Sequence, residues 1–190
     1  MDHGELEGRR LDGGEPSDRD LMARIARSDR DAMRLLYERH LRALDAFLRG
    51  RGADPSTAAD TVQDTMLEVW RRAGRYAGAS SVKTWMFSIA RNKLVDRQRR
   101  AVRVSLVEEV PETADPDPDP EALTMAARDR ERLRGCLDGL KPAHRLVIRL
   151  AFYEDMSYEE IAEVESVPKG TVKTRVFHAK QLLLRCLGQR

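Results

Sequence analysis

The sequence is poor in cysteine and in aromatic residues, and it lacks long apolar runs. Its 190 residues include two cysteines and 5% aromatic residues, and they contain no run of eighteen apolar residues. The lack of such a run excludes a membrane-spanning helix, and residues 1–19 lack the apolar segment of a secretory signal, so we expect a cytoplasmic protein. Cys136 and Cys186 do not form a C-x-x-C pattern. A disulfide framework or a zinc knuckle therefore has little support, and we expect both cysteines to pack as small apolar residues.

Signatures of catalysis and of cofactor binding are also absent from the sequence. It has no P-loop, no dinucleotide fingerprint and no nucleophile with a matching base. His3, His40 and His144 each stand alone, so we predict no metal site and no cofactor. A DNA-processing enzyme would need metal-binding carboxylates, but the helical carboxylates mostly alternate with arginine, as on a solvated face. We therefore expect a protein that is not an enzyme.

The small net charge of +2 hides an uneven distribution along the chain. The net charge is −4 for residues 1–20, +8 for 21–100, −6 for 101–125 and +4 for 126–190. Two basic blocks separated by an acidic segment suggest two modules that meet a polyanion. From charge alone, arginine-rich helices with merely solvated faces are an equally good interpretation.

The two acidic segments are predicted to lack a packed core. Residues 1–19 are rich in Gly, Asp and Glu without apolar periodicity, which predicts a disordered tail. Residues 101–125 are predicted to be an acidic, proline-rich linker, because each proline in Asp115–Pro120 disfavours helix in the residue before it. The alternating aspartates suggest a calcium loop, but the prolines replace its turn glycine and Ala126 stands where its glutamate belongs.

The two basic blocks show helical periodicity, which predicts an all-α fold with two small helical domains, residues 20–100 and 126–190. In the first domain, Asp54 and Pro55 fit the N-cap and first position of a helix. A Gly- and Ser-containing loop, Gly74–Ser81, precedes the last helix of this domain. Its neighbouring aromatics and cations suit unpaired bases, which need stacking faces and pockets.

The aromatic residues of the first domain have two interpretations. Trp85 and Phe87 could serve the loop as stacking faces, but for Trp70 and Trp85 a place in the core of a small bundle is the more frequent situation. Tyr76 is the better candidate for a base contact, because it belongs to the loop itself.

The second domain ends in a predicted helix-turn-helix. Ser157–Glu160 fits a capping box, Ser166–Gly170 breaks the short helix, and a longer helix follows. The first turns of the longer helix are polar and basic, as in a recognition helix, which favours DNA contact over an ordinary helical hairpin with a basic face. The residues predicted to face duplex DNA are Thr171, Lys173, Thr174, Arg175, Phe177 and His178.

These motifs, in this order and at these separations, resemble the extracytoplasmic-function (ECF) class of bacterial sigma factors. The resemblance covers about residues 21–100 and 126–187. It is carried by Leu36–His40, Asp60–Trp70, Trp85–Arg100, Ser157–Ala162 and Pro168–Arg175.

The resemblance implies a subunit that binds core RNA polymerase, at its clamp helices and flap, and directs promoter recognition, promoter melting and transcription initiation. The first domain would be sigma region 2 and the second sigma region 4. The implied minus-ten contacts, which capture the melted non-template strand, are Tyr76, Ser80, Ser81, Lys83, Arg91 and Asn92. The implied polymerase-binding residues are Asp60, Gln63, Asp64 and Glu68. The duplex-facing residues of the second domain would then read the minus-thirty-five element.

The resemblance further implies an anti-sigma partner and a linker that threads the polymerase channels. Two departures from the family pattern concern the second domain. Glu165 and Ser166 stand where an apolar residue and glycine are common, which puts the turn geometry in question, and His178 and Lys180 stand where arginine is common. The alternative function is an autonomous helix-turn-helix regulator that binds duplex DNA without polymerase. The two basic domains offer no evident dimer geometry for a palindromic operator.

Overall fold

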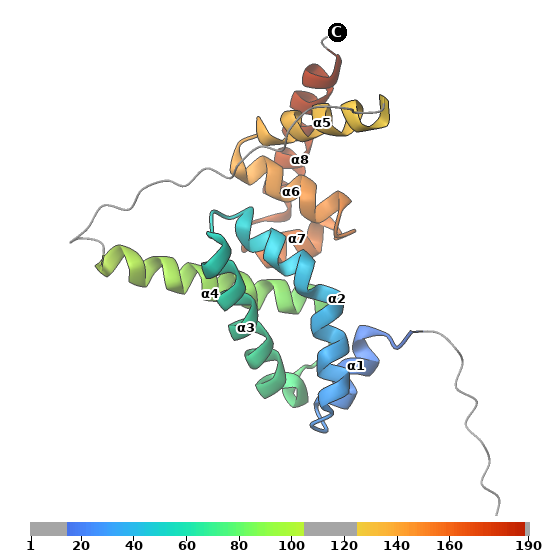
Figure 1. Cartoon of the computed structure of the whole chain (residues 1–190), viewed down its shortest axis with the longest axis vertical. Coiled ribbons are helices and arrows are strands. Elements are labelled where there is room, and N and C mark those ends of the chain that lie inside the picture. The colour runs from blue at the N-terminus through green and yellow to red at the C-terminus, as the bar shows by residue number, and fades with distance from the viewer. Residues whose placement is uncertain (1–14, 105–124, 189–190) are drawn as a thin grey trace, which may run out of the picture.

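The computed structural model describes residues 15–104 and 125–188, which form helices and no strand, so the predicted all-α class is confirmed (Figure 1). The first module consists of α1 (Asp18–Ile25), α2 (Arg30–Arg49), α3 (Pro55–Arg72), the short 3-10 turn η1 (Ala73–Arg75) and α4 (Val82–Val104). The second module consists of α5 (Met125–Asp138), α6 (Pro142–Phe152), α7 (Tyr158–Glu165) and α8 (Lys169–Gly188). None of these helices is long and apolar enough to cross a membrane.

The core of the first module forms where α2, α3 and α4 meet. Asp54 caps α3 by accepting hydrogen bonds from the backbone of Ser56 and Thr57, and Pro55 occupies the first turn, as predicted. The rings of Phe47 and Phe87 are fully buried, with centroids 5.0 Å apart. Phe87 is therefore a core residue and not a stacking face for bases. Trp70 and Trp85 are half-buried against the same core, as the frequency argument predicted.

Helix α1 begins inside the segment that was predicted to be a disordered tail. The Ser17 side chain accepts a hydrogen bond from the Asp20 backbone, and the Asp20 side chain bonds back to Ser17, which makes a capping box. The predicted tail, residues 1–19, thus extends too far, and its residues 1–14 lie outside the described residues.

Packing of α1 on α2 also gives His40 a partner that sequence spacing did not indicate. A carboxylate oxygen of Asp18 lies 2.7 Å from His40 Nε2, and its other oxygen accepts from Arg39 at 2.7 Å. Burial alone would raise the pKa of Asp18, but these hydrogen bonds hold it below its usual value.

The helix-turn-helix of the second module is formed despite the departure at its turn. Ser157 and Glu160 make the predicted capping box at the start of α7. Ser166 ends α7 in the left-handed conformation, with φ of 52°, at the position where the family commonly has glycine. A side chain in this conformation costs about 1–2 kcal/mol, which the serine tolerates here. The turn then places Val172 and Val176 of α8 in the core.

The cysteine prediction was wrong, because Cys136 of α5 and Cys186 of α8 form a disulfide bond with a Cα–Cα distance of 5.8 Å. The cysteines are 50 residues apart, and only the packing of α5 on α8 brings them together. Motif spacing along the chain carries no information on such a contact. Cys136 is buried and Cys186 is exposed.

The helices on either side of the predicted linker extend into its ends. Helix α4 continues through residues 101–104, where neither glycine nor proline interrupts it, and α5 starts at Met125. The acidic stretch with Asp115–Pro120, for which the calcium loop was considered, lies outside the described residues.

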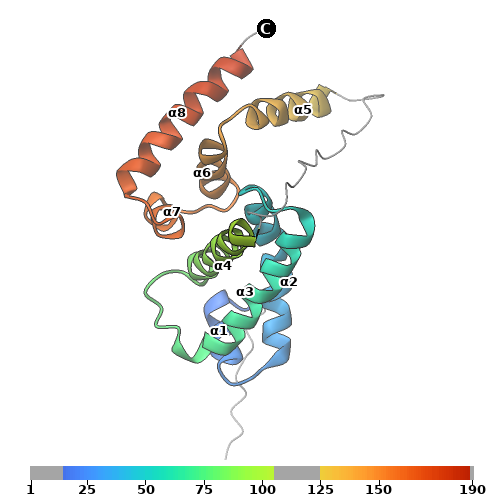
Figure 2. The same cartoon turned by 90° about the vertical axis from the view of Figure 1, so that its left-hand side faces the viewer.

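The two modules pack against each other through α7 and α4. Figures 1 and 2 both show α7 beside the N-terminal half of α4. The buried apolar side chains form one cluster that includes Met86 and Leu94 of α4 as well as Ile161 and Val164 of α7. The relative position of the modules is thus fixed by a packed interface.

Candidate nucleic-acid and polymerase interfaces

Four of the six predicted minus-ten residues line one cavity of about 660 Å³ at the start of α4. These residues are Tyr76, Ser80, Ser81 and Lys83. The Tyr76 hydroxyl donates to the Ser80 carbonyl at 2.5 Å, and its ring lies 5.3 Å from the Trp85 ring. Burial raises the pKa of the Tyr76 hydroxyl above its usual value. The loop is therefore folded around an aromatic pair, and Gly78 makes its turn with φ of 71°.

The opposite wall of this cavity is acidic and comes from the second module. Glu159, Glu160 and Glu163 of α7 line it. The Ser81 and Thr84 hydroxyls donate to the same oxygen of Glu160, at 2.8 and 2.9 Å. Burial alone would raise the pKa of Glu160, but hydrogen bonds from the Ser157 backbone and from these two hydroxyls hold it below its usual value.

Lys83 is also engaged by the second module. Its Nζ atom lies 2.8 Å from a carboxylate oxygen of Glu154 and 2.8 Å from the Glu154 carbonyl oxygen. The Glu154 side chain is 9% exposed, so this ion pair is largely shielded from water. The loop that was predicted to contact an unpaired base is thus covered on one side by carboxylates of the second module.

The remaining two predicted minus-ten residues lie about two turns further along α4. Arg91 is half-buried and donates to the Asn92 side chain at 3.2 Å, while Asn92 is exposed. The six residues therefore form two groups on one helix and its preceding loop.

The predicted polymerase-binding residues of α3 divide between two sides of the helix. Asp60 and Asp64 lie beside Arg97 of α4, with a 2.5 Å contact for Asp64. Glu68 pairs with Lys93 of α4 at 3.4 Å and with Arg72 at 2.5 Å. These carboxylates are thus partly neutralised by cations of the same module.

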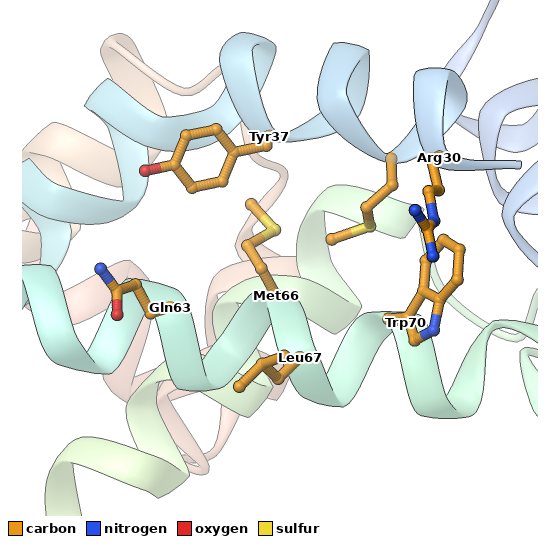
Figure 3. A pocket seen from close by; sticks show the side chains of 7 residues that line it. Arg30, Tyr37, Gln63, Met66, Leu67 and Trp70 are labelled. Atoms are coloured by element: carbon orange, nitrogen blue, oxygen red, sulfur yellow. The ribbon is translucent and has the colours of Figure 1, made fainter.

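Gln63 instead faces α2 across an apolar groove of about 530 Å³ (Figure 3). The groove is lined by Arg30, Met33, Tyr37, Gln63, Met66, Leu67 and Trp70. Leu67 is 53% exposed, although it is apolar. Leu67 was not among the residues predicted to bind polymerase, which are the acidic and amide side chains of this stretch. The signal was a leucine one position away from the buried stripe that contains Met66 and Val69.

The residues of α8 that were predicted to face duplex DNA differ in their exposure to solvent. Lys173, Thr174, Phe177 and His178 are exposed, with 59% exposure for Phe177. Thr171 and Arg175 are half-buried, and Arg175 lines a cleft between the modules together with Arg51 and Gln98.

Two contacts support the outer surface of α8. The rings of His144 and His178 stack with centroids 6.4 Å apart, and burial, with the neighbouring His178, lowers the pKa of His144. Lys180 Nζ lies 4.9 Å from the centre of the Phe152 ring. In the part of the chain that the structure describes, no group of three His, Cys, Asp or Glu side chains is arranged to hold a metal ion.

Comparison with protein-family models gives two matches, one in each module. The model described as Sigma-70 region 2 matches residues 36–104, and the model described as Sigma-70, region 4 matches residues 130–183. Together they cover the loop at the start of α4, the groove on α3 and the helix-turn-helix.

Curated relatives align with almost the whole chain. The ECF RNA polymerase sigma factor SigK of Mycobacterium sp. (strain JLS) is 31% identical over 172 residues, with 88% of this chain and 89% of the relative covered. The ECF RNA polymerase sigma factor SigL of Mycobacterium tuberculosis (strain ATCC 25618 / H37Rv) is 30% identical over 166 residues, with 85% of this chain and 94% of the relative covered.

Two solved structures share the arrangement of helices. CnrH in complex with the cytosolic domain of CnrY has a TM-score of 0.60 and 28% identity, and the match covers 90% of this chain and 97% of that one. The sigma factor RpoE in complex with the anti-sigma factor NepR from Bartonella quintana has a TM-score of 0.63 and 25% identity, with 82% and 96% covered.

Proposed function

Since the chain belongs to the extracytoplasmic-function sigma factors of the sigma-70 family, we propose that residues 20–100 read the minus-ten element and residues 126–190 the minus-thirty-five element. As a sigma factor it binds RNA polymerase and directs it to promoters, and it is not an autonomous regulator. Factors of this kind initiate transcription without doing chemistry themselves. The observation that carries the proposal is the presence of both sigma regions, each with its own polar and basic surface, in one chain.

For the minus-ten element, we propose that the melted non-template strand contacts the loop before α4. The pocket formed by Tyr76, Ser80, Ser81 and Lys83 supplies an aromatic face, hydroxyls and a cation, which are the groups that an unstacked base and its phosphate need. Arg91 and Asn92 extend this polar surface along α4. For the minus-thirty-five duplex, the exposed side chains at positions 173, 174, 177 and 178 are the foremost contacts, and Thr171 and Arg175 flank them.

For the polymerase, we propose that the clamp helices dock on the groove between α2 and α3. Its exposed Leu67 and its side chains Tyr37 and Trp70 offer the apolar anchors that stable interfaces use, and Gln63 lies at the same groove. Asp60, Asp64 and Glu68, which face cations of α4, are proposed as additional acidic contacts on the same helix.

A Leu67→Asp variant tests this docking surface. A carboxylate in the apolar groove is expected to weaken binding of core RNA polymerase about 10-fold or more, because the charge loses its hydration in the interface. The measurement is the affinity of fluorescently labelled chain for core polymerase. Leu67→Met, which keeps an apolar side chain of similar volume, is the matched control and is expected to bind like the natural chain. Equal binding by both variants would place the clamp helices elsewhere.

We also propose an anti-sigma factor as a partner and the cytoplasm as the site of action. The two solved structures described above each hold their protein in complex with a second one, CnrY or the anti-sigma factor NepR. RNA polymerase and DNA lie in the cytoplasm of bacteria, so a factor that acts on both is expected there.

Run-off transcription with core RNA polymerase tests the proposed function as a whole. The template is the promoter region upstream of the chain's own gene. A specific transcript is expected only when chain, core polymerase and template are combined, while the chain alone binds the same duplex weakly. Tight sequence-specific duplex binding without polymerase, together with no transcript, would contradict the proposal.

A further inference from the structure

Arg19, near the start of α1, lies against the loop that precedes α4. It lines the cavity of about 660 Å³ that also contains Tyr76 and Lys83, and it lines a second cavity of about 300 Å³ together with Tyr76 and Gly78. A Cβ atom placed on Gly78 would lie 2.7 Å from Arg19 Nη2, which is closer than a real Cβ atom approaches such a neighbour. The Arg19 guanidinium thus rests on the bare backbone of Gly78, and the glycine permits this close approach.

The neighbours of Arg19 in α1 hold it in this position. The capping box described above fixes the first turn of α1, and Leu21 and Met22 after it are buried. The adjacent Asp18 is already engaged by two side chains of α2. Arg19 itself is exposed, and among the described residues no hydrogen bond or ion pair engages its guanidinium. This cation is therefore available to a ligand at the loop.

The charge of Arg19 acts on the aromatic ring that the proposed function assigns to the base. Burial raises the pKa of the Tyr76 hydroxyl, and the positive charge of Arg19 opposes this rise. Lys83, in the first turn of α4, is a second cation at the same cavity. A nucleotide combines a stacking base with a negatively charged phosphate, so an aromatic ring between cations from two helices matches a nucleotide and its flanking phosphates.

We propose that Arg19 binds a backbone phosphate of the melted non-template strand, next to the base that contacts Tyr76. This inference rests on the proposed function of the loop before α4, and it adds a contact from α1, which lies outside that loop. A guanidinium can donate two parallel hydrogen bonds to a phosphate, which fixes the direction of the strand and neutralises its charge. Because all nucleotides share the phosphate, Arg19 orients the strand without selecting a base.

The Arg19→Ala variant tests the proposal in the holoenzyme, assembled from the full chain and core RNA polymerase. The template is the promoter of the chain's own gene, with the minus-ten element premelted by mismatches. Loss of the phosphate contact is expected to raise the dissociation constant of the template about three- to tenfold. The slope of log affinity against log salt is expected to become shallower by about 0.7, the value for one phosphate of a single strand.

The matched control is Arg27→Ala, which removes an exposed arginine just beyond the other end of α1. It is expected to bind the template like the natural chain, with the same salt slope. Arg19→Lys keeps the charge but lacks the planar fork, so it is expected to retain the salt slope and to lose part of the affinity.

A second measurement locates the phosphate. A methylphosphonate, which is a neutral analogue of the phosphate, replaces each phosphate of the non-template minus-ten strand in turn. At one position it is expected to weaken binding by the natural chain and to leave binding by Arg19→Ala unchanged, since both changes remove the same contact.

The proposal is overturned if the methylphosphonate weakens both chains equally at every position, or if Arg19→Ala and Arg27→Ala show the same affinity and salt slope. A Tyr76→Ala variant separates this result from a failure of the proposed loop. Weaker template binding by Tyr76→Ala, with no effect of Arg19→Ala, refutes the phosphate contact alone. If neither substitution changes template binding, the loop assignment and the contact at Arg19 are both wrong.

Discussion

Reduction of the Cys136–Cys186 bond, or its removal in a Cys136→Ser/Cys186→Ser variant, is expected to destabilise the second module by about 4 kcal/mol. The bond closes a loop with a sequence separation of 50, and loop-closure entropy sets this magnitude. The loop contains α6, α7 and most of α8, so the whole helix-turn-helix lies inside it. Cys186 is exposed, and a reductant can reach it.

Among the described residues, α5 packs less extensively against α8 than α6 does. Leu137 of α5 and Leu183 of α8 are only partly buried, and Arg132 donates to the Leu187 carbonyl at 2.6 Å. By contrast, Val172, Val176 and Ala179 anchor the first half of α8 in the core. Loss of the bond is therefore expected to release α5 and the end of α8, while the recognition turns keep their packing.

Amide hydrogen exchange measures this effect locally. Protection of α5 and of the last two turns of α8 is expected to fall on reduction, whereas protection in α2 and α3 stays the same. Both tryptophans belong to the first module, so tryptophan fluorescence would not report the change. The serine variant is expected to behave like the reduced chain and to be insensitive to reductant. Unchanged protection in both samples would show that the bond adds nothing to the packing of α5.

The parts of the fold that could be predicted from the sequence are those fixed by neighbouring residues. Asp54 with Pro55, and Ser157 with Glu160, satisfy backbone donors within one turn, so their local patterns are sufficient to locate helix starts. The helix-turn-helix follows from such a start and a break near Ser166. The same logic would have located α1, because Ser17 and Asp20 make a capping box, but the acidic composition around them masked the pattern.

The parts that could not be predicted depend on contacts between distant residues. His40 and Asp18 meet because α1 folds back on α2, and Cys136 meets Cys186 because α5 crosses α8. The candidate site shows the same limit. The stretch from Asp60 to Glu68 gave the correct helix, but only packing against α2 and α4 separates Gln63 from the carboxylates.

The contacts between modules could not be predicted at all. Glu160 was recognised as a capping residue, and its second role as acceptor for Ser81 and Thr84 depends on a pairing 79 and 76 residues away. A single carboxylate with four lone-pair sites can serve both purposes. The capping box thus accounts for the presence of Glu160 at the start of α7, and it gives no indication that Glu160 also contacts the first module.

Replacing Lys173 by alanine is expected to lower minus-thirty-five-dependent transcription about 10- to 100-fold while polymerase binding stays intact. Lys173 is exposed in the second turn of α8, where a recognition helix meets base edges and phosphates. Removal of one such contact costs about 1–3 kcal/mol, which is about 5- to 150-fold and contains the expected range. The exposed Arg185→Ala variant, in the last turn of the same helix, is the matched control for loss of one positive charge.

The Arg175→Ala variant tests whether a residue that lines the cleft between the modules also recognises the minus-thirty-five element. Arg175 is half-buried and lines the cleft between the modules beside Arg51 and Gln98, whereas Lys173 is exposed. We expect the substitution to impair run-off transcription on the intact promoter without weakening polymerase binding, as for Lys173→Ala. On a template with a scrambled minus-thirty-five element, neither substitution is expected to matter, because the contact that each removes no longer exists. A loss of the same size on both templates, or an equal loss of polymerase binding, would mean that α8 acts in assembly and not in recognition.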